Sequence, residues 1–280
     1  MPTLVLPFPA IDPVLIEFGP FAIRWYALAY VAGLLLGWYY MRRLVSADGL
    51  WRGTPHPSLL QVDDFVVYAT LGTILGGRIG YVLLYSPDYY LSNPAEILQV
   101  WTGGMSFHGG FLGVVAAMIV FAWRHKLSLW TLFDLAGTVA PIGLFFGRIA
   151  NFINGELWGR PSDVPWAMVF PGAGPEPRHP SQLYEAALEG VLLFVVTALV
   201  VRAGGYRRPG LVAGVFALGY GIARSVSELY RVPDAHIGYF QFGLTMGIIL
   251  SLPMIAAGLF AIARALSRPP ATETEPAGDA

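Results

Sequence analysis

The sequence contains no cysteine, and Lys126 is the single lysine among its 17 basic residues. The absence of cysteine excludes disulfides, zinc-thiolate sites and a cysteine nucleophile on the chain itself. Charge is also scarce, because only 12% of the 280 residues are charged and the net charge is −1, whereas a soluble domain carries about 25% charged residues. This composition argues against an ordinary soluble globule. It also gives no global field that would attract nucleic acid.

Apolar residues are abundant: 55% of the chain is hydrophobic and its mean hydropathy is +0.58. Apolar runs cover residues 21–40, 62–85, 107–123, 129–150, 183–201, 211–230 and 239–263. Most are near the ~20 residues that a helix needs to cross a bilayer, and they lack the alternation of a membrane barrel. We therefore expect an all-α integral membrane protein, a bundle of about seven transmembrane helices formed by residues 1–266.

Two segments are expected to lie outside the spans. Residues 155–180 are rich in proline and predict an irregular head loop without helix or strand. Residues 267–280 are polar and proline-rich, and they predict a disordered tail.

The basic residues predict the orientation. Ten of them follow the odd-numbered runs, whereas three lie in the opposite loops: Arg160, Arg178 and Arg231. Because basic residues favour the cytoplasmic side, we expect the N-terminus outside and both the C-terminus and the tail in the cytoplasm.

Four arginines are expected inside the spans, all in their outer halves: Arg24, Arg78, Arg148 and Arg224. His108, Glu185 and Glu189 open spans on the same side. A charge within hydrocarbon costs roughly 2.5–3.5 kcal/mol on insertion scales and usually marks a function. The pattern therefore indicates a functional polar cavity near the outer leaflet.

The densest group of polar residues closes the fourth run. Arg148 and Asn151 are three residues apart and share one helical face. Asn154 and Gly155 then predict the end of the helix, because both tolerate a left-handed backbone, and Glu156 follows in the loop. A capped helix end with a snorkelling arginine would explain Arg148 but not its polar neighbours.

The sixth run carries Arg224, Glu228 and Arg231 along one helical stripe. Arg224 and Glu228 are expected to neutralise each other, which leaves Arg148 or Arg231 without an obvious permanent partner. A buried guanidinium of this kind would bind an anion, and its planar fork fits phosphate in a bidentate way.

Two further residues have both a structural and a functional interpretation. Ser106 predicts an N-cap, which places His108 in a first helical turn, where a neutral imidazole is favoured and could act as a base. A structural histidine is the alternative. Tyr26 follows Trp25 and could equally belong to an interfacial aromatic belt.

Several chemistries have no support in the sequence. It contains no G-x-S-x-G elbow, no H-E-x-x-H pair and no P-loop. His108 and His179 lack clustered carboxylate neighbours, so no metal site is expected.

The polar blocks resemble those of the bacterial prolipoprotein diacylglyceryl transferases. The specific block is GRIANFINGELWG at 147–159, and HGG at 108–110, RHPSQLYE at 178–185 and R-x-x-x-E-x-x-R-x-P-D at 224–234 are also similar to the family. The resemblance covers nearly the whole chain. Ile248 departs from it, because a glutamine is expected there; we interpret this as a packing change away from the charged residues.

The resemblance implies a reaction that spacing alone does not. The diacylglyceryl group of phosphatidylglycerol would move to the thiol of the lipobox cysteine in a prolipoprotein signal peptide, giving a thioether and glycerol-1-phosphate. It also implies a multi-pass protein of the bacterial cytoplasmic membrane, with a periplasmic N-terminus and head loop. No cofactor is implied, because a phosphate ester is exchanged for a thioether.

The resemblance also implies roles for individual residues. His108 would be the base, Arg148 and Arg224 the clamp on the departing phosphate, Asn151 would orient the head group and Glu228 would hold Arg224. The other candidates are Glu156 for ordering the loop or assisting proton transfer, Tyr26 as a further site residue, Gly159 for a close turn of the loop, and Arg231 and Asn154 for substrate binding. The identity of the proton acceptor stays open.

Two other classes of protein fit parts of the pattern. A transporter for anionic lipid or phosphate would also use intramembrane arginines, but its site usually lies near the midplane. A structural membrane protein whose arginines bind lipid head groups would not require the Asn, Glu and His residues.

Overall fold

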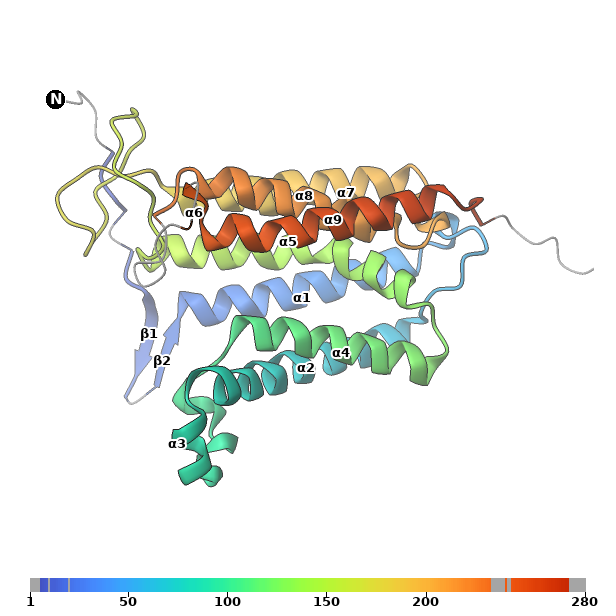
Figure 1. The fold of residues 1–280 in the computed structure, drawn as a ribbon, viewed down its shortest axis with the longest axis horizontal. Helices are drawn as coiled ribbons and strands as arrows, with labels where there is room; N and C mark the ends of the chain where they lie inside the picture. The colour runs from blue at the N-terminus through green and yellow to red at the C-terminus, as the bar shows by residue number, and fades with distance from the viewer. Residues whose placement is uncertain (1–5, 10, 20, 233–239, 241–242, 272–280) are drawn as a thin grey trace, which may run out of the picture.

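The computed structural model describes residues 6–9, 11–19, 21–232, 240 and 243–271. Most of these residues are helical, and the long helices run side by side in an elongated bundle (Figure 1). One end of the bundle carries the loop of residues 155–180, which we call the head loop, and we call this end the head end. The other end, with residues 46–58 and 267–271, is the tail end.

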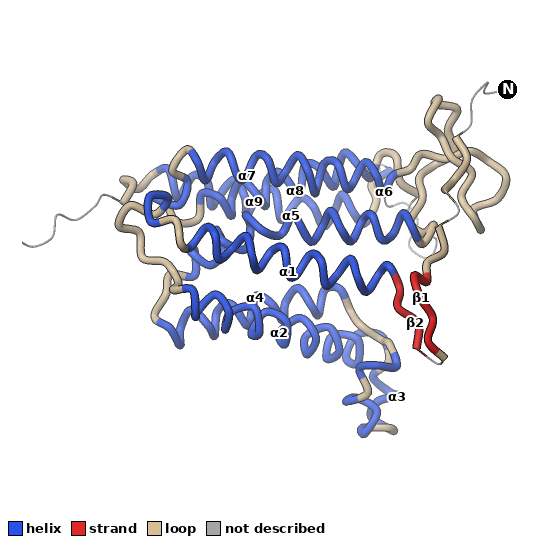
Figure 2. The backbone as a smooth tube through the Cα atoms, turned by 180° about the vertical axis from the view of Figure 1, so that it is seen from behind, coloured by secondary structure: helices blue, strands red, loops and turns tan. Residues whose placement is uncertain are grey.

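The long helices coincide with the predicted apolar runs. They are α1 (Trp25–Val45), α2 (Leu59–Tyr85), α4 (Phe107–His125), α5 (Leu129–Ile153), the α6–α7 segment, α8 (Leu211–Glu228) and α9 (Met246–Leu266). The α6–α7 segment is continuous and consists of α6 (Ser181–Glu185), a π-helical stretch (Ala186–Leu192) and α7 (Leu193–Arg202). Within the described residues, five are long and apolar enough to cross a membrane: α2, α4, α5, the α6–α7 segment and α9. The protein is therefore a mostly helical, multi-pass membrane protein. Helices α1 and α8 lie in the same bundle (Figure 2), and their spanning of the membrane remains a prediction.

Two small elements were not predicted. Strand β1 (Val14–Phe18) pairs antiparallel with β2 (Phe21–Arg24) in a hairpin that leads into α1. Arg24 ends β2 and is the N-cap residue of α1, so it lies at the end of the first predicted span and not within its helix. Between α2 and α4, helix α3 (Pro87–Ser92) and two 3₁₀ turns (Pro94–Leu98 and Val100–Thr102) form an arm that projects from the bundle (Figures 1 and 2).

Helices α2 and α4 pack through glycine. Gly72, Gly76 and Gly80 on α2 face Gly109 and Gly113 on α4, so that a Cβ built at Gly76 would lie 2.6 Å from the Cα of Gly113. Backbone contact this close brings the helices together by van der Waals packing, which drives helix association in membranes. We call α2, α4 and their connection the glycine-packed hairpin.

The tail end holds the largest apolar core. Trp51 stacks on Tyr206 with a centroid distance of 4.2 Å, and both side chains are about 1% exposed. Nearby, the buried carboxylate of Asp134 accepts hydrogen bonds from the backbone N–H groups of Gly210 and Ala213, both at 2.7 Å. These groups begin α8, so α5 caps α8 from another part of the chain.

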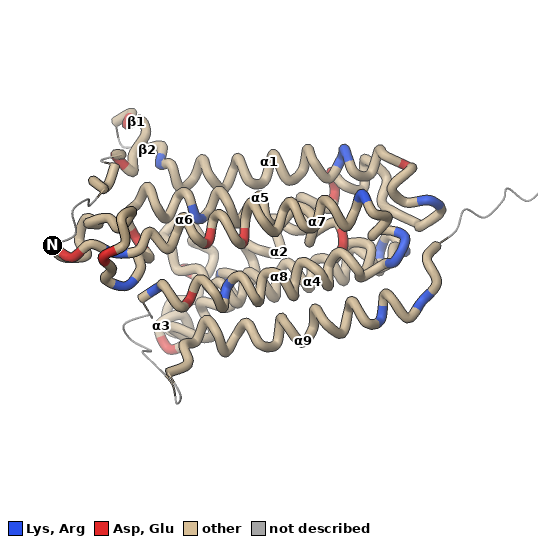
Figure 3. Tube along the Cα trace, turned by 90° about the horizontal axis from the view of Figure 1, so that it is seen from above, with Lys and Arg blue, Asp and Glu red and all other residues tan. Residues whose placement is uncertain are grey.

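The predicted disordered tail is only partly described. Ala271 donates a backbone hydrogen bond to Arg207 at 2.8 Å, which holds residues 267–271 against the tail end. The remaining part of that prediction, residues 272–280, lies outside the described residues. Charged residues concentrate toward the two ends of the bundle, and long middle stretches of the helices carry none (Figure 3).

Candidate active site

Charged side chains from α5, α6 and α8 form a line of ion pairs at the head end. Arg148 Nε lies 2.7 Å from Glu185 Oε2, and the other carboxylate oxygen of Glu185 lies 3.0 Å from Arg224 Nη1. Arg224 Nη2 is in turn 2.6 Å from Glu228 Oε2. One carboxylate, that of Glu185, therefore sets the spacing between the two guanidinium groups.

A third carboxylate joins the line from the π-helical stretch. Glu189 Oε2 lies 3.2 Å from Arg148 Nη2. Glu185, Glu189 and Glu228 are at most 4% exposed, and buried carboxylates of this kind require charged or hydrogen-bonding partners. Widened helical turns occur frequently at functional sites, and this one carries Glu189 to Arg148. We call Arg148, Glu185, Glu189, Arg224 and Glu228 the ion-pair cluster.

The cluster confirms one sequence prediction and corrects another. Arg224 and Glu228 pair as expected along one face of α8. The prediction that Arg148 could lack a permanent partner is wrong, because Glu185 and Glu189 both bind it. These glutamates follow Arg148 by 37 and 41 residues, so no local spacing indicates the contact. Their place at the opening of the fifth run was the only signal.

Neither arginine side chain is fully enclosed by its carboxylate partners. Arg148 and Arg224 have side chains 17% and 13% exposed. Among the described residues, no hydrogen bond occupies Nη1 of Arg148 or Nε of Arg224. These N–H groups can donate to an anion while the glutamates keep the guanidinium planes in place.

The last turn of α5 continues the polar surface. Asn151 Nδ2 donates to Glu156 Oε1 at 2.7 Å, and the side chain of Gln182 donates to the backbone carbonyl of Glu156 at 2.5 Å. Tyr26, on the first turn of α1, interacts with Asn151 and with the Glu156 carboxylate. The predicted site residues Tyr26, Asn151 and Glu156 therefore meet in space.

The predicted end of α5 is confirmed. The helix ends at Ile153, and Asn154 caps it in a right-handed conformation with φ −71°. Gly155 takes the left-handed conformation, with φ +63°, that starts the head loop.

Gly159 has a packing role that spacing did not indicate. A Cβ at this position would lie 2.5 Å from the carbonyl oxygen of His179 and 2.6 Å from that of Tyr230. The head loop is thus pressed between two other segments, and Gly159 forms a bridge with Arg231. Arg160 extends the contact, because its Nε donates to the carbonyl of Arg231 at 2.9 Å. Gly159 and Arg231 therefore lie where the head loop joins the end of α8.

An aromatic group fixes the base of the head loop. Trp166 Nε1 donates to the Tyr184 hydroxyl at 2.6 Å, and that hydroxyl lies 2.9 Å from His179 Nδ1. Because indole is a donor only, the hydroxyl oxygen accepts the bond from Trp166, and the same hydroxyl forms a second hydrogen bond with His179. Partial burial lowers the pKa of His179, which favours its neutral form.

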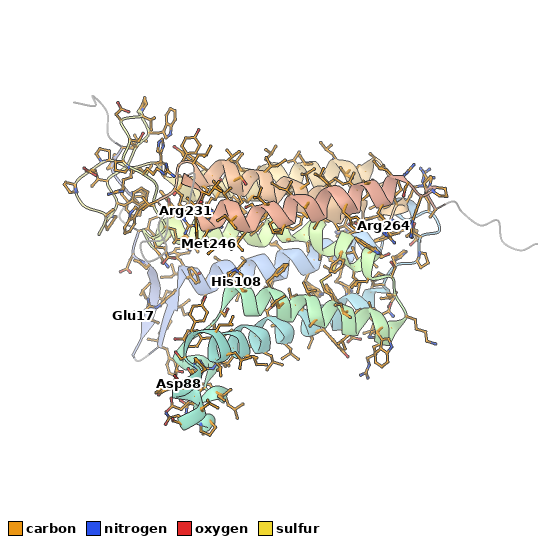
Figure 4. All side chains as sticks on the ribbon, in the orientation of Figure 1. Glu17, Asp88, His108, Arg231, Met246 and Arg264 are labelled. Atoms are coloured by element: carbon orange, nitrogen blue, oxygen red, sulfur yellow. The ribbon has the colours of Figure 1, made fainter. Side chains whose placement is uncertain are left out.

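His108 lies apart from the ion-pair cluster. It occupies the first turn of α4, where Ser106 Oγ caps the helix by accepting from Gly109 N–H at 3.2 Å, as predicted. Its side chain is exposed, and α4 lies across α1 from α5 (Figures 2 and 4). Among the described residues, no hydrogen bond or ion pair links His108 to the cluster.

Arg78 forms hydrogen bonds with the arm and not with the ion-pair cluster. Its side chain donates to the backbone carbonyls of Glu96, Ile97 and Gly103 at 2.6–2.9 Å, and its guanidinium lies over the ring of Tyr90. The residue is 3% exposed. Its predicted contribution to a shared arginine cavity is therefore wrong, because carbonyls of the arm take its donors.

Ile248 lies nearer the cluster than its sequence position indicated. It belongs to the first turn of α9, and a Cβ on the adjacent Gly247 would lie 2.6 Å from the carboxylate of Glu228. The expectation that this turn lies away from the charged residues is wrong. Two residues of the fourth similar block, Pro233 and Asp234, lie outside the described residues.

Taken together, the fold and the site define a class. A multi-pass helical membrane protein carries two guanidinium groups at one end of its bundle, each held by buried carboxylates and each on a side chain that is partly exposed. In the part of the chain that the structure describes, no group of three or more His, Asp or Glu side chains could hold a metal ion. The class is a multi-pass helical membrane protein with paired charges between the helices at one end of its bundle, and charges of this kind in membrane proteins usually mark a functional site.

Comparison with known proteins identifies the family. Residues 13–264 match the family model of prolipoprotein diacylglyceryl transferase. The chain is 57% identical over 267 residues to a phosphatidylglycerol–prolipoprotein diacylglyceryl transferase of Nitrobacter winogradskyi, covering 95% of this chain and 92% of the relative. Relatives of the same name from Rhizobium meliloti (58% over 266 residues; 94% and 95% covered) and Bradyrhizobium diazoefficiens (54% over 271 residues; 96% of each) are also similar. The chain belongs to the prolipoprotein diacylglyceryl transferase family, and it is a transferase.

Proposed function

We propose that the protein transfers the diacylglyceryl group of phosphatidylglycerol to the cysteine thiol of a prolipoprotein signal peptide. The observation that carries this proposal is the identity of more than half of the aligned residues to transferases of that name over nearly the full length of both chains. The arginines of the ion-pair cluster support it, because a phosphodiester substrate requires donors for its anionic oxygens.

The bond changes follow from the two substrates. The thiolate sulfur attacks the glycerol carbon that bears the phosphate ester, a carbon–sulfur bond forms, and the carbon–oxygen bond to phosphate breaks. The diacylglyceryl group is then held by a thioether, and glycerol-1-phosphate leaves with the electron pair. The thiol proton passes to a base, since a free thiol with a pKa of about 8.5 is only partly ionised at neutral pH.

The main catalytic task of the protein is to stabilise the negative charge that develops on the departing phosphate. Nη1 of Arg148 and Nε of Arg224 supply donors that are fixed before the reaction, because Glu185 holds both side chains. Fixed donors aimed at developing charge are commonly the largest catalytic contribution. Glu228 orients Arg224 from its other side.

The remaining candidates act around this clamp. Asn151 and Tyr26 orient the glycerol head group, and Glu156 holds Asn151. His108 is the base for the thiol, which approaches from the α1–α4 side of the bundle. Arg231, Asn154 and Gly159 border the substrate where the head loop meets the helices.

The membrane arrangement is also part of the proposal. Helices α1 and α8 span the membrane with the five apolar ones, which gives seven spans. The excess of basic residues at the tail end supports a cytoplasmic C-terminus, and the N-terminus and head loop then lie in the periplasm of a bacterial cytoplasmic membrane.

The test uses purified protein in detergent with phosphatidylglycerol and a lipobox peptide. We expect glycerol phosphate release together with a diacylglyceryl mass gain on the peptide cysteine. A peptide with Cys→Ser is the control, and it should give neither signal. Lipid binding without any thiol-dependent release would reject the transferase and favour a transporter of anionic lipid.

A further inference from the structure

The first residues of the head loop are bonded to the helices that carry the ion-pair cluster. We call residues 156–160 the strap. The backbone N–H of Glu156 donates to the carbonyl of Asn151 on α5 at 3.1 Å, and the carbonyl of Glu156 accepts from the side chain of Gln182 on α6 at 2.5 Å. One side of the strap is therefore tied to two of the three helices that form the cluster.

The other side of the strap is bonded to the chain that leaves α8. The backbone N–H of Arg160 donates to the carbonyl of Tyr230 at 2.8 Å, and the N–H of Val232 donates to the carbonyl of Trp158 at 3.5 Å. These antiparallel contacts place the strap along the end of α8, which is the third helix of the cluster.

The side chain of Arg160 caps this end of α8. The last carbonyls of a helix lack N–H partners within the helix, and Glu228 is the last residue of α8. Arg160 Nη2 donates to the carbonyl of Glu228 at 3.3 Å, and its Nε donates to the carbonyl of Arg231 at 2.9 Å. The positive charge of Arg160 also suits the negative end of the helix dipole.

Glu228 connects this cap to the ion-pair cluster. Its carbonyl accepts from Arg160, and its carboxylate lies 2.6 Å from Nη2 of Arg224. Glu228 is 4% exposed, and a Cβ on Gly247 of α9 would lie 2.6 Å from its carboxylate. The side chain therefore has little room to move independently of its backbone, so a shift in the last turn of α8 also shifts the partner of Arg224.

We propose that Arg160 is a positioning residue for the transfer reaction. By capping α8 from the strap, it fixes the Glu228 carboxylate and thereby the direction in which Arg224 presents its donors to the departing phosphate. Arg160 acts through Glu228 and not by contact with the substrate. The proposal rests on the transferase function and adds a residue that this function requires. A displacement of about 1 Å far from the reacting atoms can lower a rate about 10²-fold, so a backbone cap can affect turnover.

The experiment compares two substitutions of Arg160 with a matched control. Arg160→Met removes the donors and keeps a long side chain, whereas Arg160→Lys keeps the charge and loses the planar fork. Arg207→Met is the control, because Arg207 also donates its Nε to a backbone carbonyl, that of Ala271 at 3.3 Å, but at the tail end.

We expect a change in kcat and not in KM. Arg160→Met should lower kcat roughly tenfold and change the KM values for phosphatidylglycerol and peptide less than about twofold, because a misdirected donor weakens the transition state more than the ground state. Arg160→Lys should restore part of kcat, and Arg207→Met should behave as the unchanged protein does.

A double-mutant cycle with Glu228→Gln separates positioning from a loss of stability. If Arg160 acts through Glu228, Arg160→Met should lower kcat by less than about twofold in the Glu228→Gln background, because the link is already broken there. A purely structural role would lower kcat by the same factor in both backgrounds.

Binding of glycerol-1-phosphate gives a second readout that needs no turnover. This product carries the charge that develops on the departing phosphate, so its affinity for Arg160→Met should fall roughly fivefold. Titration of the purified protein in detergent measures the affinity.

Three outcomes would overturn the proposal. The first is an Arg160→Met variant with unchanged kcat and unchanged affinity for glycerol-1-phosphate. The second is an equal loss of kcat in the two backgrounds. The third is a higher KM for the peptide alone, which would assign Arg160 to docking of the peptide. Failure of the transferase itself would appear separately, as an absence of thiol-dependent glycerol phosphate release by the unchanged protein, and the binding titration would then decide the role of Arg160.

Discussion

The glycine-packed hairpin and the region around the ion-pair cluster both hold helices together, but through different interactions. In the hairpin, Gly76 and Gly113 let two helix backbones touch directly. Around the cluster, α5, α6 and α8 are joined by ion pairs between partly exposed arginines and carboxylates that are at most 4% exposed. One region is held by shape and the other by electrostatic pairing.

The difference separates the proposed chemical roles. The hairpin carries His108, whereas the cluster carries Arg148 and Arg224. Backbone packing places a helix accurately and carries no charge, while paired charges hold donors that a phosphate can use. The base and the clamp therefore come from parts of the molecule that can be disturbed independently.

The largest effect is expected from removing an arginine of the ion-pair cluster. Arg148→Ala removes the partner of Glu189 and one partner of Glu185, so we expect turnover to fall about 10²–10³-fold and stability by about 3–5 kcal/mol. Glycerol phosphate release and unfolding in denaturant measure the two quantities. Adding Glu189→Gln should return part of the stability and none of the turnover. Recovery of turnover in that double variant would argue against a catalytic role for Arg148.

A smaller effect is expected from adding a methyl group where α2 and α4 touch in the glycine-packed hairpin. A Cβ at Gly113 would lie 2.8 Å from the Cα of Gly76 and overlap the carbonyl of Gly72, so Gly113→Ala should cost about 1–3 kcal/mol. A Cβ at Gly143 on α5 would have no other atom within 4 Å. Gly143→Ala is therefore the control. Thermal unfolding in detergent should show a loss for Gly113→Ala alone. Equal melting temperatures would mean that the helices of the hairpin can separate without cost.

The smallest effect is a pH dependence of the folding stability that arises from His179 at the base of the head loop. Burial lowers the pKa of His179, so below a pH of about 6.5 the unfolded chain binds more protons than the folded one. The contribution of neutral His179 to stability is complete above that pH and declines as the pH falls toward the lowered pKa. Thermal unfolding between pH 5 and pH 8 measures it.

His179→Gln is the variant that checks this origin, because glutamine does not titrate in the same range. We expect a flatter profile between pH 5 and pH 6.5 in this variant than in the unchanged protein. An identical acid-side slope in both would assign the pH dependence to other groups.

Much of the architecture could be predicted because membrane insertion is a local requirement. A run such as 129–150 must be predominantly apolar to replace water with hydrocarbon, and α5 (Leu129–Ile153) follows it closely. Caps are local as well, which is why Ser106 and Gly155 were found from their neighbours. The β1–β2 hairpin and the arm around α3 carry weaker local signals and were missed.

The sequence by itself determined the membrane class, the positions of the long helices and the family, because composition, hydrophobic length and similar blocks are properties of the chain. Only the tertiary structure decided which carboxylate meets which guanidinium. Arg78 and Arg148 are both arginines in apolar helices, yet one binds carbonyls of the arm and the other binds Glu185 and Glu189. The reason is physical: a buried charge takes the partner that helix packing brings within 3 Å or so, and that choice depends on residues far away along the chain.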